Sequence, residues 1–256
     1  MFNTTHIVYM IVSAIISAAV IFALCFFKNK RLSEIAIWVL AIGTVIIHFS
    51  GLWYGYFFEG DNTISVEYMI PVFPCHICMW LLVISATLLN NDGPIARVIK
   101  DFTFWGGTVC GSIGIILNEN FAATPTLTDF YVLKGLLSHS TMIVGCILLL
   151  ALGYVKIGVW RSLLSVLSGL VLFFIDGTIA NAAFLKYGYG EFNAMFLQFP
   201  PYEDLPFVNF SLIVILSLSV TFVTSAIYEQ ITLPHKKRWY NIFTRLLKKE
   251  ETEKKA

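Results

Sequence analysis

The sequence predicts an all-α membrane protein: a bundle of seven transmembrane helices with its N-terminus outside and its C-terminus in the cytoplasm. Of the 256 residues, 57% are hydrophobic and only 13% are charged, whereas soluble domains are about 25% charged. The apolar residues form stretches of about 20, the length that a helix needs to cross a ~30 Å hydrocarbon core. Basic residues gather in every second connection between these stretches, which indicates the topology.

Seven stretches have the length and composition of a membrane-spanning helix, or nearly so. They are residues 7–27, 35–57, 68–89, 102–117, 131–155, 163–184 and 207–228. The fourth stretch is short and rich in glycine. Among the seven helices, we therefore expect this one first to be distorted. We expect the first stretch to be a retained helix because its positive charge follows the apolar run, unlike that of a cleaved signal peptide.

The connections alternate in basic charge. One side of the membrane receives 15 of the 17 basic residues, and the other receives only Lys134 and Lys186. Cytoplasmic connections carry the excess of lysine and arginine, so the first side is predicted to be cytoplasmic. The 15 residues are Lys28, Lys30, Arg31, Arg97, Lys100, Lys156, Arg161, Lys236, Lys237, Arg238, Arg245, Lys248, Lys249, Lys254 and Lys255.

Residues 1–233 are expected to form one transmembrane domain, and residues 234–256 a basic cytoplasmic tail. In the tail, Trp239, Ile242, Phe243 and Leu246 have helical spacing among basic residues. This pattern suits a short helix on the anionic inner leaflet or, equally, a stop-transfer charge cluster. The aromatic connection 185–206 suits either a lid over the bundle or an anchor at the membrane interface. No internal repeat is visible, which disfavours a transporter built from inverted repeats.

Ionisable and nucleophilic groups are costly within a membrane, so each one in an apolar stretch is a functional candidate. Four of them, on four different helices, are expected about 10–13 Å below the outer boundary at ~1.5 Å per residue. This common depth indicates one polar layer in the outer half of the bundle. The four residues are His48, Cys75, His139 and Asp176.

A thiol beside an imidazole is a nucleophile–base pair. His76 is turned ~100° from Cys75 on a helix, so Cys75 must find its base on another helix, either His139 or His48. Asp176 could orient the His139 imidazole or pair with His48. Asn118 and Asn181, near outer helix ends, could donate to an oxyanion or simply cap helices. Cys25, Cys110 and Cys146 are expected to pack as small apolar residues, and Cys78 mainly so.

Three motifs resemble a known family. They are the segment Pro71-Val-Phe-Pro74-Cys75-His76-Ile-Cys78, the segment Phe104-Trp105-Gly106-Gly107 followed by His139 in the next helix, and the segment Phe192-Asn193-Ala-Met-Phe-Leu197 followed by Pro200. Their order is similar to that of the YwaF-type bacterial integral membrane proteins. These are relatives of the eukaryotic acyltransferase called transmembrane protein 164.

The resemblance implies a Cys–His lipid acyltransferase that works through an acyl-thioester, with Cys75 and His139 as the catalytic pair. It also implies a phospholipid or lysophospholipid substrate. We expect no cofactor or metal, and the apolar stretches predict a multi-pass location in the cell membrane. The sequence departs from the family at Leu117-Asn118-Glu119, where Thr-Pro is usual, and after Asn193, where Tyr is common. These departures concern loop geometry and substrate choice rather than the pair itself.

Two other classes of function remain open. Cys75-x-x-Cys78 has the spacing of a dithiol that exchanges with a quinone or with secreted proteins, although no second cysteine pair lies in an outer connection. A non-enzymatic receptor or transporter is the third reading, and Cys75, Cys78 and two histidines could form a zinc site. Nucleic acid is not an expected partner because the basic residues follow the inner face of the membrane. The number of subunits is left open.

Overall fold

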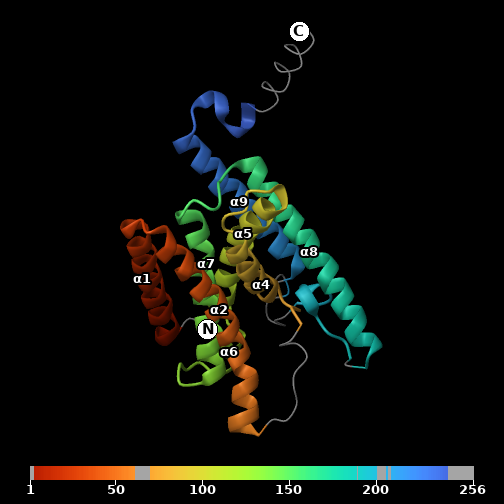
Figure 1. The fold of residues 1–256 in the computed structure, drawn as a ribbon. Helices are drawn as coiled ribbons and strands as arrows, with labels where there is room; N and C mark the ends of the chain where they lie inside the picture. Colours follow the sequence, from red (N-terminus) through yellow and green to blue (C-terminus); the bar gives the residue numbers. More distant parts are fainter. Residues whose placement is uncertain (1–2, 61–69, 189, 201–205, 207–208, 242–256) are drawn as a thin grey trace.

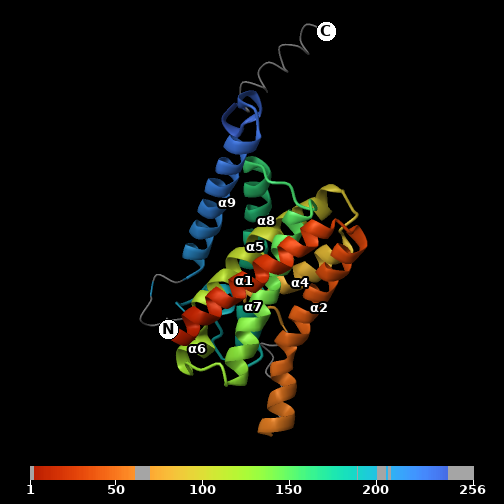
Figure 2. The same cartoon turned by 90° about the vertical axis from the view of Figure 1, so that its left-hand side faces the viewer.

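A computed structural model describes residues 3–60, 70–188, 190–200, 206 and 209–241, and in these ranges it contains helices and no strands (Figures 1 and 2). The predicted all-α class is confirmed. The α-helices are α1 (Thr4–Phe27), α2 (Lys30–Tyr54), α4 (Pro74–Thr87), α5 (Pro94–Ile116), α6 (Glu119–Ala123), α7 (Phe130–Ala151), α8 (Val159–Lys186) and α9 (Phe210–Thr232). A π-helical turn, η1 (Gly55–Glu59), continues α2, and short 3-10 turns form η2 (Ala194–Phe196), η3 (His235–Lys237) and η4 (Trp239–Asn241).

Each of the seven expected stretches overlaps one long helix. Within the described residues, five helices are long and apolar enough to cross a membrane: α1, α2 with η1, α7, α8 and α9. Of the other two, α4 has 14 residues, and α5 carries Arg97, Lys100 and Asp101 in its first two turns. The chain is therefore a multi-pass membrane protein, while the count of seven spans stays a prediction.

Helix α7 lies at the centre of the bundle, against α2 on one side and α5 on the other (Figures 1 and 2). Helix α5 also packs against α4 and α8, and α9 packs against α8. Two glycines let these helices approach closely, because a Cβ at Gly107 would overlap the sulfur of Cys146 and one at Gly169 would overlap the ring of Phe102. Small residues at such crossings are typical of membrane helices.

The connections sort into two ends of the bundle. Contacts at the first end join Lys30 to Asn90, Arg161 to Asp101, and Val159 to Glu229. Contacts at the opposite end join Asn3 to Pro125, Tyr131 to Glu59, and Met195 to Val72. The first end is the one expected to be basic, so the loops group as the charge pattern predicts. Which end faces the cytoplasm stays a prediction.

The structure corrects the starts of two helices. The helix expected over 68–89 begins only at Pro74, its first helical residue, so Pro71 lies in a turn before the helix rather than in its first turn. Proline lacks an N–H and forces the preceding residue out of the helical region, and Phe73 is accordingly extended. Helix α5 begins at Pro94, eight residues before the expected start at 102, because three charged residues in its first two turns lower the hydropathy of that part.

Two other expectations concern the connections. Of the interfacial helix expected in the tail, Ile242, Phe243 and Leu246 lie outside the described residues, and Trp239 lies in η4. The aromatic connection packs on the bundle in its described part, where η2 holds Met195 fully buried. Residues 201–205 of that connection lie outside the described part.

Candidate active site

Cys75 lies at the N-terminal end of a helix. It is the second residue of α4 and not seven residues inside a helix, as the stretch 68–89 predicts, because residues 70–73 are not helical. Its sulfur is within hydrogen-bonding reach of the backbone N–H groups of Cys75 and His76. Such N–H groups at a helix start, together with the helix dipole, stabilise a negative charge. At this position the N–H groups offset only part of the cost of burying a charged sulfur.

The His139 imidazole is oriented by the backbone of its own helix. Its Nδ1 lies 2.7 Å from the carbonyl oxygen of Gly135, one turn earlier in α7. A carbonyl oxygen only accepts, so Nδ1 carries the proton and donates it in this bond. The other ring nitrogen, Nε2, is then left as a proton acceptor, which is the state that a general base needs.

The expectation that Asp176 orients His139 is therefore wrong, since the Gly135 carbonyl takes that position. Within the described residues, the Oδ2 atom of Asp176 is buried and has no hydrogen-bond partner. The alternative pairing of Asp176 with His48 stays a prediction; the recorded ring contacts of His48 are with Phe49 and His76.

Gly114 of α5 makes room for the His139 ring. A Cβ at this position would overlap Nε2, Cδ2 and Cε1 of the imidazole. The side chain of Asn118 donates to the Gly114 carbonyl oxygen at 3.2 Å and accepts the N–H of Phe121 at 2.9 Å. Asn118 thus lies close to His139, but its recorded hydrogen bonds cap α6 and hold the end of α5.

Asn181, the second amide expected near an oxyanion, has a different role. Its Oδ1 accepts the N–H of Ala194 at 2.7 Å, and its Nδ2 donates to the Ala194 carbonyl oxygen at 3.3 Å. Asn193 in turn donates to the carbonyl oxygen of Phe199 at 2.6 Å. Both amides hold the turn η2, which packs over the segment before Cys75 through the hydrogen bond from the Met195 N–H to the Val72 carbonyl, 2.8 Å.

Lys134 is a member of the site that the sequence analysis treated only as an outer charge. It lies in the second turn of α7 with 7% of its surface exposed. Its ammonium group interacts electrostatically with Cys75, His76 and His139. Its charge therefore acts on both the thiol on α4 and the imidazole on α7. The signal was present in the sequence, because Lys134 falls inside the apolar stretch 131–155, where any ionisable residue is a candidate.

Two more histidines lie beside these groups. The rings of His48 and His76 are 4.4 Å apart at an angle of 63°, and both lie between α2 and α4. His76 thus turns toward His48, while Cys75 needs another partner, as the helical geometry predicts. Among the residues that the structure describes, no group of three or more His, Cys, Asp or Glu side chains could hold a metal ion.

The remaining cysteines pack in the core or near the first end of the bundle. Cys78, Cys110 and Cys146 are buried, and all five cysteines are free thiols. A Cβ at Gly106 would come within 3.2 Å of the Cys78 sulfur, and Trp105 beside it is 4% exposed. The Trp105-Gly106-Gly107 motif therefore brings α5 against α4 and α7. The expectation that Cys110 and Cys146 are packing residues is confirmed.

A model of the family described as the TMEM164 family matches residues 1–228. The chain belongs to this family. The matched region contains α1 to α8 and most of α9, and so includes Cys75, Lys134 and His139. No curated protein and no solved structure matches the chain.

Membership of the TMEM164 family agrees with the resemblance that the sequence motifs carry. The Pro71–Cys78 motif forms the entry to α4, with Cys75 at the helix start. The Trp-Gly-Gly motif forms the close contact behind it, and the Asn193 motif forms the turn η2 over it. The three motifs, far apart in the sequence, therefore lie around the start of α4 in this chain.

Proposed function

We propose that this TMEM164-family protein is a membrane-embedded acyltransferase that acts on glycerophospholipids, with Cys75 as nucleophile and His139 as general base. One observation carries the proposal: the 2.7 Å hydrogen bond from Nδ1 of His139 to the Gly135 carbonyl oxygen. It leaves Nε2 ready to accept a proton, in a cluster where Lys134 interacts with both Cys75 and His139. This arrangement follows the logic of a nucleophile, a base and a group that orients the base.

In the first half of the reaction, the Cys75 thiol gives its proton to Nε2 of His139. The sulfur then attacks the carbonyl carbon of an acyl ester of the phospholipid. When the C–O bond breaks, the leaving alkoxide takes the proton from His139 and departs as a lysophospholipid. The acyl group remains on Cys75 as a thioester.

In the second half, the hydroxyl group of a lysophospholipid gives its proton to Nε2 and attacks the thioester carbonyl. The C–S bond breaks, and the Cys75 sulfur recovers the proton from His139. Atoms and protons balance over the two halves without any cofactor. The acyl chain has moved from one glycerophospholipid to another.

The surroundings of the pair favour transfer over hydrolysis. The turn η2 and the segment before α4 cover this part of the bundle, with the rings of Phe73 and Phe196 stacked 5.6 Å apart. A site that excludes water protects a reactive thioester until a lipid hydroxyl arrives. The N–H groups at the start of α4 and the Lys134 ammonium offset part of the cost of burying the thiolate that forms during the reaction.

The proposal is tested by acyl transfer from a labelled phosphatidylcholine to an unlabelled lysophospholipid, with the full-length protein reconstituted in vesicles. Cys75→Ser and His139→Ala are each expected to lower the rate at least 100-fold, roughly the contribution of a positioned general base. Cys25→Ser is the matched control, since Cys25 lies at the far end of the bundle beside the Ala151 carbonyl. Transfer that continues unchanged in Cys75→Ser would overturn the proposal.

A further inference from the structure

A second candidate binding place lies at the end of the bundle opposite Cys75. It is a cavity of about 510 Å³ between the first two turns of α2 and the end of α4. We call it the α2–α4 groove. It is lined by Arg31, Glu34, Ile35, Trp38, Ala86, Thr87, Leu89 and Asn90. None of these residues belongs to the proposed active site.

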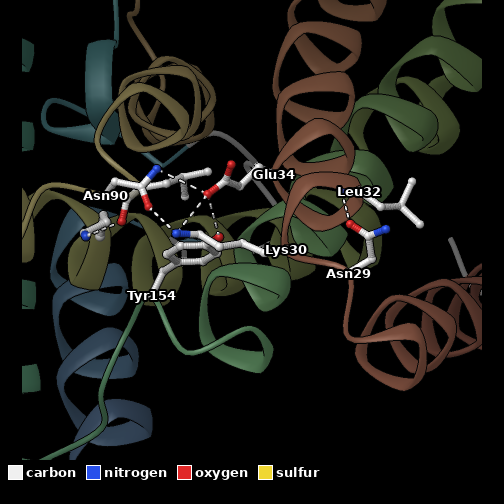
Figure 3. A network of polar contacts seen from close by, with 8 residues as sticks. Asn29, Lys30, Leu32, Glu34, Asn90 and Tyr154 are labelled. Atoms are coloured by element: carbon white, nitrogen blue, oxygen red, sulfur yellow. Dashed lines mark hydrogen bonds and ion pairs between the residues drawn. The ribbon is translucent and has the colours of Figure 1, made fainter.

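The polar rim of the α2–α4 groove has an excess of positive charge. The Glu34 carboxylate is 3.6 Å from the Lys30 ammonium and accepts from Asn90 Nδ2 at 3.2 Å and Tyr154 OH at 3.4 Å (Figure 3). Lys30 also donates to Asn90 Oδ1 at 2.8 Å. Lys30 therefore balances the charge of Glu34. Arg31 adds a further positive charge, and among the described residues it has no recorded hydrogen bond or ion pair.

The wall of the α2–α4 groove is apolar and continues into the lipid-facing side of α2. Ile35 is 50% exposed and Trp38 is 37% exposed, and one turn further Ile42 is 42% exposed. Leu89 closes the groove from the side of α4. A tryptophan in such a place is typical of the membrane interface, where its ring lies at the level of the headgroups. The groove thus offers a cation at its rim and a path for a hydrocarbon chain below it.

We propose that the α2–α4 groove binds an anionic glycerophospholipid of the inner leaflet. Its phosphate pairs with Arg31, its glycerol lies beside Trp38, and an acyl chain runs along Ile35 and Ile42. Charge complementarity selects this occupant, because the rim carries one unbalanced positive charge and the basic end of the bundle is predicted to face the anionic leaflet. A soluble anion would leave the apolar wall uncovered.

Trp38 provides a direct test by fluorescence. The full-length protein is placed in phosphatidylcholine nanodiscs that contain either brominated phosphatidylcholine or brominated phosphatidylglycerol, since bromine quenches nearby tryptophans. The chain has six tryptophans, so the Trp38 signal is the difference between wild type and Trp38→Phe. We expect brominated phosphatidylglycerol to occupy the groove about fivefold more strongly than brominated phosphatidylcholine, the ratio that corresponds to about 1 kcal/mol for one basic side chain.

Two matched variants distinguish lipid binding in the α2–α4 groove from general attraction of anionic lipid to the basic surface. Arg31→Gln is expected to reduce the preference to about one. Arg97→Gln, which removes an exposed arginine from the first turn of α5 at the same end of the bundle, is expected to retain it. Equal quenching by the two brominated lipids in the wild type would overturn the proposal. So would an equal loss of preference in the two variants, because it would indicate unspecific attraction of anionic lipid.

Discussion

The substitution Gly114→Ala tests the geometry of the proposed site more sharply than removal of a reactive group. The added Cβ would overlap three atoms of the His139 ring, so the ring or the helix must move. The Gly135 carbonyl holds the ring from the other side, which leaves little room for rotation. A displacement on the order of 1 Å costs about 100-fold in rate when a catalytic group loses its alignment. We therefore expect acyl transfer to Cys75 to slow about 100-fold in Gly114→Ala.

A matched control separates this effect from simple overpacking. Gly111 is one turn earlier on α5, and a Cβ there would lie 2.6 Å from Cγ1 of Ile143 on α7, away from the imidazole. Both substitutions should destabilise the bundle by about 1–3 kcal/mol, which thermal unfolding in detergent measures. The assay is the rate at which a labelled phospholipid acylates Cys75 at a temperature where both variants are folded. An equal rate in Gly111→Ala and Gly114→Ala would refute the reasoning.

Three more predictions concern charged groups. Lys134→Met should slow alkylation of Cys75 by iodoacetamide about tenfold, the equivalent of about 1.4 kcal/mol of charge interaction, and Lys134→Arg should recover much of the rate; equal rates in all three proteins would contradict this. Asp101→Asn should lower the free energy of unfolding by about 2–3 kcal/mol, because it removes the ion pair between the buried Asp101 and Arg161. The Arg161 side chain is 34% exposed, so solvent screening keeps the effect below that of a fully buried pair. An unchanged denaturation midpoint would exclude this contribution. Glu229→Ala should speed hydrogen exchange at the Trp239 amide, which donates to this carboxylate at 2.6 Å, and unchanged exchange there would contradict the contact.

The hydropathy and charge patterns predicted the long helices and the grouping of their connections, because burial in lipid acts on every residue of a spanning helix. They missed the start of α4 at Pro74, where local proline geometry overrides the apolar pattern of residues 70–73. They missed the start of α5 at Pro94 for the opposite reason, since Arg97 and Lys100 continue a helix beyond its apolar part. Apolar length alone therefore predicts that a helix exists better than where it begins.

The candidate site could be predicted only in part. Residue type identified Cys75 and His139 as candidates. Helical geometry predicted that His76 faces away from Cys75, and in the structure the His76 ring lies beside His48. The prediction that Asp176 orients His139 was wrong, because the backbone carbonyl of Gly135 does so instead. Every residue has a backbone carbonyl, so the pattern of side chains in the sequence cannot indicate this hydrogen bond. The His139 ring of α7 packs against Gly114 of α5. This contact depends on where the two helices cross, which cannot be predicted from the residues around either position.

The most direct test of a Cys–His acyltransferase is detection of the acyl group on the protein. Purified full-length protein is incubated with a labelled phospholipid, and its cysteine peptides are analysed by mass spectrometry. We predict an acyl adduct on Cys75 that hydroxylamine removes, that is absent from Cys75→Ser, and that fails to turn over in His139→Ala. An adduct-free Cys75 joined to Cys78 in a disulfide would contradict the account and favour thiol–disulfide exchange instead.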